Sequence, residues 1–226
     1  MKLYAVIVAG GSGKRMSTVT PKQFLELSGK PVLMHTIERF ILYSDSIEII
    51  TVLPEGHIKF WSGLLERYSF TFPQTLVTGG KSRFFSVKNG LEYVGDQGLV
   101  AIHDGVRPLV SIETIRRCFE TAEKLGNAIP VISSSDTLRM VTETGNEPIN
   151  RLNIKQVQTP QVFYSEIIRK AYQQDYIPEF TDDATVLEKT GIKINLVEGN
   201  RENIKLTNPE DLLIARSLYS RISYLA

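Results

Sequence analysis

The sequence predicts a three-layer α/β/α sandwich around a Rossmann-like, mostly parallel sheet, with one β-arm that protrudes from it. Two observations predict the sandwich. Short apolar runs alternate along the chain with segments of helical periodicity, which is typical of βαβ units. Polar, glycine-rich segments such as 9–16 and 78–83 follow these runs, where ligands bind at the carboxyl ends of parallel strands.

The expected strands are short runs rich in apolar and β-branched residues. The first, residues 3–8, is apolar throughout, as a fully buried strand should be. The full set is 3–8, 47–53, 74–78, 98–103, 128–132 and 193–198.

Residues that favour helix ends mark the helices between these strands. Pro31 is expected to begin the first helix. Proline lacks a backbone N–H, but the N–H groups of the first helical turn have no partner within the helix, so none is lost. Ser111 caps a later helix that ends before Gly126. Two further helices are expected, one from Thr181 to Gly191 and one that starts at Asn208-Pro209.

Residues 134–157 interrupt the alternation. We expect 137–141 and 154–157 to be strands of a long hairpin, with 142–148 as its turn region. Such a hairpin has little core of its own, so a partner must cover it. We therefore predict one domain over 1–226 with this excursion as a β-arm that packs on a second copy, forming a homodimer. A hairpin folded back on its own domain is the alternative.

Composition narrows the class of protein. The chain has 226 residues, 42% hydrophobic and 23% charged, with a net charge of +1, which argues against bulk binding of nucleic acid. The single cysteine, Cys118, excludes an intrachain disulfide and is expected to be a small buried residue. No apolar run approaches the ~20 residues of a membrane span and no signal peptide precedes the first strand, so we expect a cytoplasmic protein.

The segment from Ala9 to Met16 is suited to phosphate. It holds three glycines and two cations directly after a strand, so backbone amides and positive charge converge there, with Lys22 close by in sequence. It matches neither the P-loop, which needs Ser or Thr after Gly13-Lys14, nor the dinucleotide fingerprint, which needs a third glycine at Met16. A simple turn is the alternative interpretation.

A second candidate is the segment His103 to Pro108. Asp104 follows a strand, and one carboxylate at that edge can hold Mg²⁺ whose other ligands are waters and phosphates. Arg107 can pair with Asp104 or with a phosphate. The alternative is an aspartate satisfied by backbone amides. His103 is expected to be structural rather than a general base, and three histidines in all give little support for a multi-histidine metal site.

Two weaker candidates lie at other expected strand ends. Gly79 and Gly80 allow the backbone to approach a flat ligand such as a base, although Ser82 next to them is equally suited to cap a helix. Lys205, before the last helix, either faces the same sheet edge or is a solvated surface lysine.

These segments, in this order, resemble the 2-C-methyl-D-erythritol 4-phosphate cytidylyltransferase family. The matching residues span nearly the full chain. They are Ala9 to Met16, Pro21-Lys22-Gln23, Gly79-Gly80 through Arg83 and Ser86, His103-Asp104 with Arg107-Pro108, Asp136-Thr137, Arg151, Thr159-Pro160-Gln161, Thr181-Asp182-Asp183-Ala184, Val197-Glu198-Gly199 and Asn203-Ile204-Lys205.

The resemblance implies a nucleotidyltransferase that joins CTP to methylerythritol phosphate and releases pyrophosphate, a step of the non-mevalonate route to isoprenoid precursors. It implies that Arg15 and Lys22 stabilise the α-phosphate in the transition state, while Arg151 and Lys205 position the acceptor. The nucleotide site would comprise Ala9, Gly10, Gly11, Gly13, Gly80, Lys81, Arg83 and Ser86. The acceptor site would comprise Asp104, Arg107, Thr137, Arg151, Thr181 and Lys205. Asp104 would also hold Mg²⁺, and the arm would bring Thr137 and Arg151 to the partner's site.

Two stretches depart from the commoner family pattern. The usual Ala-Ala-Gly is here Ala9-Gly10-Gly11, and the usual His-Asp-Ala-Ala-Arg is here His103 to Arg107 with Gly and Val in the middle. The ribitol 5-phosphate cytidylyltransferases share several of these motifs and stay an alternative, but the 181–184 segment and the context of Arg151 look more like the methylerythritol enzymes.

More distant alternatives fit less well. Sugar 1-phosphate nucleotidyltransferases share a Gly-x-Arg-Met pattern, but the arm and the segment 203–205 argue against them. A regulatory nucleotide-binding module without catalysis is at odds with the presence of the whole charged set, namely Arg15, Lys22, Asp104, Arg151 and Lys205.

Overall fold

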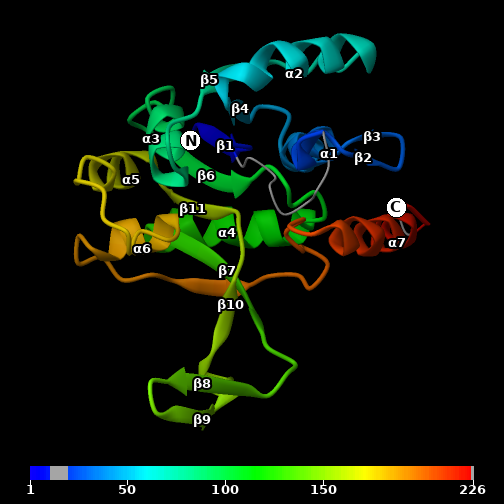
Figure 1. The fold of residues 1–226 in the computed structure, drawn as a ribbon. Coiled ribbons are helices and arrows are strands. Elements are labelled where there is room, and N and C mark those ends of the chain that lie inside the picture. The colour runs from blue at the N-terminus through cyan, green and yellow to red at the C-terminus, as the bar shows by residue number, and fades with distance from the viewer. Residues whose placement is uncertain (11–19, 225–226) are drawn as a thin grey trace.

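The computed structural model describes residues 1–10 and 20–224, with side chains through Ser220. Its centre is an eight-stranded sheet with helices on both faces (Figure 1). The strand order is β10-β7-β11-β6-β1-β4-β5, and β12 also pairs with β7. The strands are β1 (Leu3–Val8), β4 (Glu48–Leu53), β5 (Gln74–Thr78), β6 (Leu99–Asp104), β7 (Asn127–Ser133), β10 (Lys155–Val157), β11 (Gln161–Tyr164) and β12 (Leu196–Glu198).

Parallel pairing gives the middle of the sheet one common carboxyl edge. Strand β1 pairs in parallel with both β4 and β6, and β4 pairs in parallel with β5. Strand β11 runs antiparallel between β6 and β7. The chain therefore leaves β1, β5 and β6 on the same side, where Ala9, Gly79 and Gly105 begin the connecting segments.

Alternation along the strands builds a separate core on each face. On one face Ala5 and Ile7 of β1 belong to a cluster with α1 (Val32–Tyr43), α2 (Glu55–Arg67) and α4 (Ile112–Leu125). On the other face Tyr4, Val6 and Val8 pack with α3 (Arg83–Leu91), α5 (Ser165–Ala171) and α6 (Asp183–Glu188). The predicted three-layer α/β/α class is confirmed.

One long helix and several short elements complete the fold. Helix α7 (Pro209–Tyr224) packs against the short strand β2 (Glu26–Leu27), which pairs with β3 (Lys30–Pro31). Single 3-10 turns are η2 (Lys22–Phe24) and η3 (Arg151–Asn153). No helix in the described ranges 1–10 and 20–224 has the length and apolar character that crossing a membrane requires. That residues 1–226 form one domain stays a prediction.

Most predicted helix ends agree with the structure. Helix α1 begins directly after Pro31. The Ser111 hydroxyl accepts a hydrogen bond from the Thr114 amide, and Gly126 ends α4 with a φ of 92°. One cap was wrong: α6 begins after Asp182, whose carboxylate accepts from the Thr185 amide, because an aspartate one residue after Thr181 provides the stronger capping box.

The arm was predicted with the wrong second strand. Strand β8 (Leu138–Thr142) pairs with β9 (Gly145–Ile149), and the two extend away from the rest of the fold (Figure 1). The turn is therefore Glu143-Thr144, and the Gly145-Asn146 pair that suggested a turn begins β9 instead. Residues 155–157 form β10, which pairs with β7 in the main sheet.

Strand β11 was not predicted as a strand. The segment Gln161–Tyr164 is short and follows Pro160, so it gives little periodic signal. It nevertheless joins β6 to β7 within the sheet, which carries the chain from the arm back to the centre.

Candidate active site

A pocket of about 280 Å³ lies at the carboxyl edge formed by β1, β5 and β6, and we call it the sheet-edge pocket. It gathers glycines, cations and one carboxylate from segments far apart in sequence. Its lining residues are Val8, Ala9, Gly10, Lys22, Gln23, Gly80, Lys81, Ser82, Arg83, Ser86, Asp104, Val106 and Lys205.

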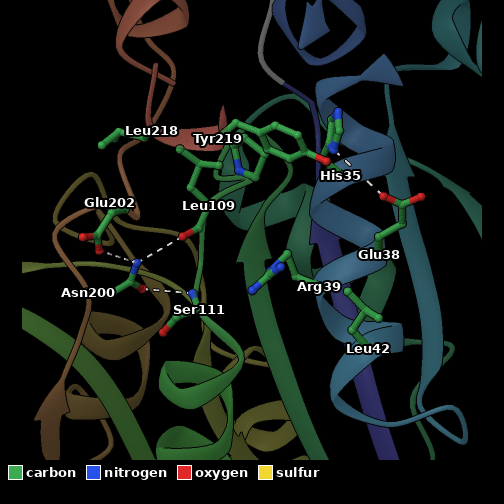
Figure 2. A pocket seen from close by; sticks show the side chains of 11 residues that line it. His35, Glu38, Arg39, Leu42, Leu109, Ser111, Asn200, Glu202, Leu218 and Tyr219 are labelled. Atoms are coloured by element: carbon green, nitrogen blue, oxygen red, sulfur yellow. Dashed lines mark hydrogen bonds and ion pairs between the residues drawn. The ribbon is translucent and has the colours of Figure 1, made fainter. Parts of the chain in front are cut away.

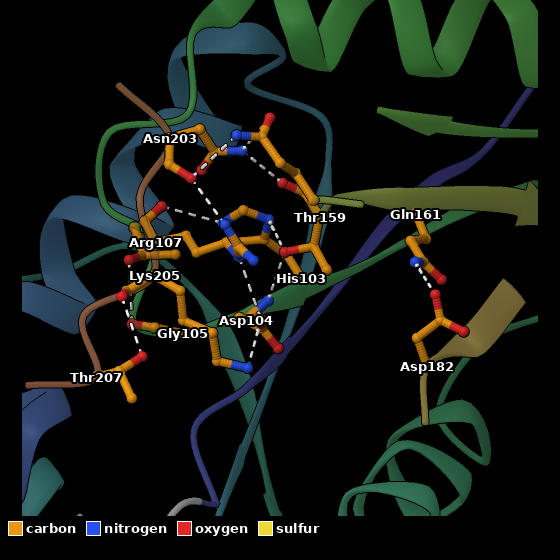
Figure 3. Close-up of polar contacts among 12 residues, drawn as sticks. His103, Asp104, Gly105, Arg107, Thr159, Gln161, Asp182, Asn203, Lys205 and Thr207 are labelled. Atoms are coloured by element: carbon orange, nitrogen blue, oxygen red, sulfur yellow. Dashed lines mark hydrogen bonds and ion pairs between the residues drawn. The ribbon is translucent and has the colours of Figure 1, made fainter. Parts of the chain in front are cut away.

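Asp104, the last residue of β6, is the centre of charge in this pocket (Figure 3). Its Oδ2 lies 3.0 Å from Lys205 Nζ and 3.2 Å from Arg107 Nε, and its Oδ1 lies 3.5 Å from Arg83 Nε. Burial raises the pKa of the carboxyl group, but Arg83, Lys205 and Arg107 together hold it well below its usual range. The pocket therefore keeps an ionised carboxylate surrounded by positive charge.

Arg83 is the first residue of α3, and it forms hydrogen bonds to a second carboxylate, that of Asp183. Its Nη1 and Nη2 donate to the two oxygens of Asp183 at 2.8 and 2.7 Å. Burial alone lowers the pKa of a guanidinium, but Asp183 and Asp104 raise that of Arg83 well above its usual value. Asp183 is fully buried at the start of α6, and sequence reasoning missed this partnership because nothing local links positions 83 and 183.

The 79–86 turn requires glycine at one position. A Cβ on Gly80 would lie 2.3 Å from Phe85 Cβ, which no side chain tolerates without a shift of the turn. The Gly80 amide donates to Ser86 Oγ at 3.1 Å, so Ser86 fixes this turn from within. Ser82 lines the pocket and occupies the N-cap position of α3, yet its buried hydroxyl has no hydrogen-bond partner in the described part of the chain.

Gln23 is a site residue that sequence reasoning named only as part of a motif. It is 1% exposed, and its Nε2 donates to the Ala9 carbonyl at 2.9 Å. It thus ties the Pro21-Lys22-Gln23 segment to the end of β1, which carries Lys22 to the pocket wall. The position of Gln23 directly after a lysine, in the Pro-Lys-Gln motif, was the available signal in the sequence.

The structure brings many of the predicted site residues together. Those that line the sheet-edge pocket are Ala9, Gly10, Lys22, Gly80, Lys81, Arg83, Ser86, Asp104 and Lys205. Arg107 lies beside it, where its Nη1 donates to the Asn203 carbonyl at 2.7 Å. Gly11, Gly13 and Arg15 lie outside the described residues.

Three predicted residues lie apart from the pocket lining. Thr137 and Arg151 are exposed on the arm, where Arg151 Nη1 donates to the Ser135 carbonyl at 2.5 Å. Thr181 is exposed two residues before α6. Within one chain, the structure does not join these three residues to Asp104.

His103 is structural, as predicted. It is fully buried, and burial lowers its pKa to about 4. Its Nε2 lies 3.1 Å from the Arg107 carbonyl, which only accepts, so Nε2 carries the proton and Nδ1 accepts from Thr159 Oγ1 at 3.0 Å. Thr159 Oγ1 in turn accepts from the Asp104 amide at 3.1 Å. The ring thus supports the end of β6 without facing the pocket.

Cys118 also agrees with its prediction. It is fully buried in α4, and burial raises the pKa of its thiol to about 12. It is a packing residue with no nucleophilic character.

The donor set fits a magnesium ion only in combination with a phosphate ligand. Within residues 1–10 and 20–224 no group of three or more His, Cys, Asp or Glu side chains could hold a metal. Asp104 supplies one ionised carboxylate in a pocket of cations, and Mg²⁺ is commonly bound by one or two carboxylates plus substrate phosphates and water.

A second cavity, of about 380 Å³, has a different chemistry (Figure 2). Helix α1 contributes His35, Glu38, Arg39 and Leu42, and other walls include Asn200, Glu202 and Tyr219. The Asn200 amide group donates to the Leu109 carbonyl and to Glu202, both at 3.1 Å. None of the predicted site residues lines this cavity, and two acids beside one arginine do not suit a polyphosphate. The sheet-edge pocket is therefore the candidate active site.

Comparison with known proteins gives a consistent result. The model of the 2-C-methyl-D-erythritol 4-phosphate cytidylyltransferase family matches residues 3–221. The enzyme of that name from Bacteroides thetaiotaomicron is 51% identical over 218 residues, which cover 96% of this chain and 100% of the relative. The one from Porphyromonas gingivalis is 50% identical over 218 residues, covering 96% and 97%.

Solved structures agree. The 4-diphosphocytidyl-2C-methyl-D-erythritol synthase of Anaerococcus prevotii superposes with a TM-score of 0.83 at 29% identity, over 97% of this chain and 96% of that one. The Thermus thermophilus 2-C-methyl-D-erythritol 4-phosphate cytidylyltransferase gives 0.77 at 28% identity, over 97% and 100%. With its sheet-edge pocket and this match over almost its whole length, the chain belongs to the 2-C-methyl-D-erythritol 4-phosphate cytidylyltransferase family.

Proposed function

We propose that this protein transfers CMP from CTP to 2-C-methyl-D-erythritol 4-phosphate, giving 4-diphosphocytidyl-2-C-methyl-D-erythritol and pyrophosphate. An oxygen of the acceptor phosphate attacks the α-phosphorus of CTP, and the bond from that phosphorus to the bridging oxygen breaks. The observation that carries the proposal is the convergence of Arg83, Arg107 and Lys205 on Asp104 in a glycine-walled pocket.

The chemistry needs charge and position more than a base. The nucleophile is already an anionic phosphate oxygen, so catalysis consists of aligning two anions and stabilising the charge that spreads between them. Lys22 on the pocket wall is assigned to the α-phosphate, together with Arg15 outside the described residues. A positioned donor of this kind is worth roughly 3–4 kcal/mol in the transition state.

The nucleotide is assigned to the wall formed by the end of β1 and the start of α3. Backbone groups at Ala9, Gly10 and Gly80 approach it closely, because these positions offer little or no side chain. The remaining nucleotide residues are Lys81, Arg83 and Ser86, with Gly11 and Gly13 in the part outside the described residues. Ser82, whose hydroxyl is unpartnered among the described residues, is a further contact on this wall.

Mg²⁺ is assigned to Asp104. When bound there with CTP, the ion neutralises phosphate charge. Oδ2 of Asp104 is engaged by Lys205 and Arg107 at 3.0 and 3.2 Å, whereas Oδ1 has only the 3.5 Å contact with Arg83. Oδ1 is thus the less engaged oxygen and the better ligand.

The acceptor is assigned to the side of the pocket where Arg107 and Lys205 lie, and the arm completes it. Arg151 and Thr137 are exposed, and the arm also exposes Val141 at 83% and Leu152 at 76%. Apolar side chains exposed on a protruding hairpin favour a homodimer in which each arm reaches the other chain's site, near Thr181.

The homodimer is tested by sedimentation velocity. The wild-type protein should sediment as a dimer, and Val141→Asp should shift it towards monomer. Leu213→Asp, on the outer face of α7 and 64% exposed, is the matched control and should stay dimeric. A monomeric wild type would refute the role of the arm.

We propose that the protein works in the cytoplasm, because the proposed substrates are water-soluble phosphates. Fractionation of expressing cells should leave it in the soluble fraction.

The acceptor is tested by release of pyrophosphate from CTP. Methylerythritol phosphate, ribitol 5-phosphate and a sugar 1-phosphate are supplied in turn to the wild-type enzyme. The proposal expects the highest kcat/KM with methylerythritol phosphate. A higher kcat/KM with ribitol 5-phosphate or with the sugar 1-phosphate would overturn the acceptor assignment and leave the transferase class in place.

A further inference from the structure

We propose that Asp183 and Tyr172 are positioning residues that limit the contact of Arg83 with Asp104 to one long approach of Nε, at 3.5 Å, so that Oδ1 of Asp104 stays available to the metal–nucleotide complex. Neither residue lines the sheet-edge pocket. The inference rests on the proposed function, because it concerns how the assigned metal ligand is kept accessible.

The first step of the argument is how Arg83 divides its donors. Both terminal nitrogens donate to Asp183, at 2.8 and 2.7 Å, whereas only Nε faces Asp104, at 3.5 Å. A planar guanidinium binds one carboxylate best through two parallel hydrogen bonds. Here Arg83 binds Asp183 in that bidentate arrangement, and its contact with Asp104 is the weaker one.

The second step is what Arg83 would do without Asp183. The Arg83 side chain is 27% exposed, so an unpaired charge there is costly. Asp104 is the other carboxylate within 4 Å of it in the described part of the chain. A released guanidinium would therefore turn to Asp104 and cover Oδ1, the oxygen that the proposed function leaves for the ion.

The third step is how Asp183 itself is fixed. Tyr172, which follows α5 and is 1% exposed, donates its hydroxyl to Oδ1 of Asp183 at 2.6 Å. Burial raises the pKa of Tyr172 well above its usual value, which keeps the hydroxyl protonated as a donor. Its ring stacks on Phe84, the neighbour of Arg83 on α3, with ring centroids 4.8 Å apart.

The backbone at Asp183 is anchored as well. Gln161 on β11 accepts from the Ala184 amide at 2.8 Å, and its Nε2 donates to Asp182 at 2.8 Å (Figure 3). The start of α6 is thereby tied to the central sheet. Asp183 can hold Arg83 because both its side chain and its backbone are fixed.

The test is Tyr172→Phe, which removes the hydrogen bond and keeps the stacked ring. Mn²⁺ binding to the protein–CTP complex, measured by electron paramagnetic resonance without acceptor, should weaken by about tenfold, as expected for a lost hydrogen bond to a charged group. The KM for CTP should rise by a similar factor. Tyr164→Phe is the matched control: it removes a 2.8 Å hydrogen bond to the Glu123 carbonyl and should leave both values unchanged.

A double-mutant cycle separates positioning from packing. If Tyr172 acts through Arg83, then Tyr172→Phe should have no further effect on Mn²⁺ affinity in an Arg83→Ala background. Equal effects in both backgrounds, or an unchanged affinity in Tyr172→Phe alone, would overturn the inference. A wild type that binds CTP and Mn²⁺ yet does not release pyrophosphate with methylerythritol phosphate would instead contradict the proposed function and leave this cycle valid.

Discussion

The sheet-edge pocket and the arm hold their charged side chains in opposite ways. In the pocket, Asp104 is 6% exposed and three cations surround it, two of which, Arg83 and Arg107, are also bonded to Asp183 and to the Asn203 carbonyl. On the arm, Arg151 is exposed and its hydrogen bond goes to a backbone carbonyl. The pocket is thus arranged within one chain, whereas the arm gains a function only if a second surface meets it.

This difference in burial explains why the structure of one chain brings the predicted pocket residues together but not the predicted arm residues. Charges buried together must be arranged during folding, because an unpaired buried charge is too costly. An exposed arginine on a hairpin does not need to be paired during folding. Its position on one chain therefore does not determine which group it contacts in function. The following experiments contrast the two regions, beginning with the largest expected effect.

Removal of the divalent cation should abolish turnover. Two highly charged phosphates repel, and the cations of the pocket alone would not supply the neutralisation of phosphate charge that a divalent ion held by Asp104 would provide. Pyrophosphate release is measured after treatment with a chelator and again after Mg²⁺ is restored. Undiminished turnover in chelator would remove the metal role of Asp104.

Lys22→Ala should lower kcat by ~10²–10³ with little change in the free energy of unfolding. The reason is that Lys22 lines the pocket on a short 3-10 turn and is assigned to the α-phosphate. Lys30→Ala is the matched control, because Lys30 pairs with Glu38 at 2.5 Å outside the pocket. Near-normal kcat in Lys22→Ala would refute the assignment.

Arg151→Ala should raise the KM for the acceptor by about tenfold or more while leaving the KM for CTP near that of the wild type, since a hydrogen bond to a charged group is lost. Steady-state kinetics with each substrate varied in turn measures both. Arg139→Ala, another exposed arginine of the arm, bonded within it to Asn146, is the comparison. A defect confined to CTP would assign Arg151 to the other substrate.

Gly10→Ala should change kcat/KM by less than about twofold. A Cβ at Gly10 would lie 3.4 Å from Ser86 Oγ, the near limit of ordinary van der Waals contact, so the added methyl group fits without displacing Ser86. The same measurement on Gly80→Ala gives the contrast, because there the added carbon meets Phe85 Cβ at 2.3 Å. A large loss in Gly10→Ala would show that the backbone there approaches the ligand more closely than the pocket suggests.

Local sequence signals predicted the positions of many strands and helices. Short runs rich in apolar and β-branched residues located β1, β4, β5 and β6 to within a residue or so, and capping residues located α1 and α4, because these signals act over a few neighbouring positions. The arm failed at its second strand for the same reason. Gly145-Asn146 signals a turn locally, but pairing with β8 decides where the strand begins.

The site divides in the same way. Ordered motifs indicated Ala9, Lys22, Gly80, Asp104 and Lys205, and the family resemblance that they carried is confirmed. The motifs did not indicate that both terminal nitrogens of Arg83 donate hydrogen bonds to Asp183, or that the Tyr172 hydroxyl donates to the same carboxylate. Those partners are about 100 and 11 positions apart, and no local pattern links them.

By itself, the sequence determined the α/β class, the positions of the main strands and the family, since alternating apolar periodicity and ordered polar motifs are properties of the chain alone. Only the tertiary structure decided which motifs share a pocket, which oxygen of Asp104 is least engaged and which residues hold Arg83 in place. These depend on parallel pairing, which brings the carboxyl ends of β1, β5 and β6 together, and on burial, which forces each charge to find a partner.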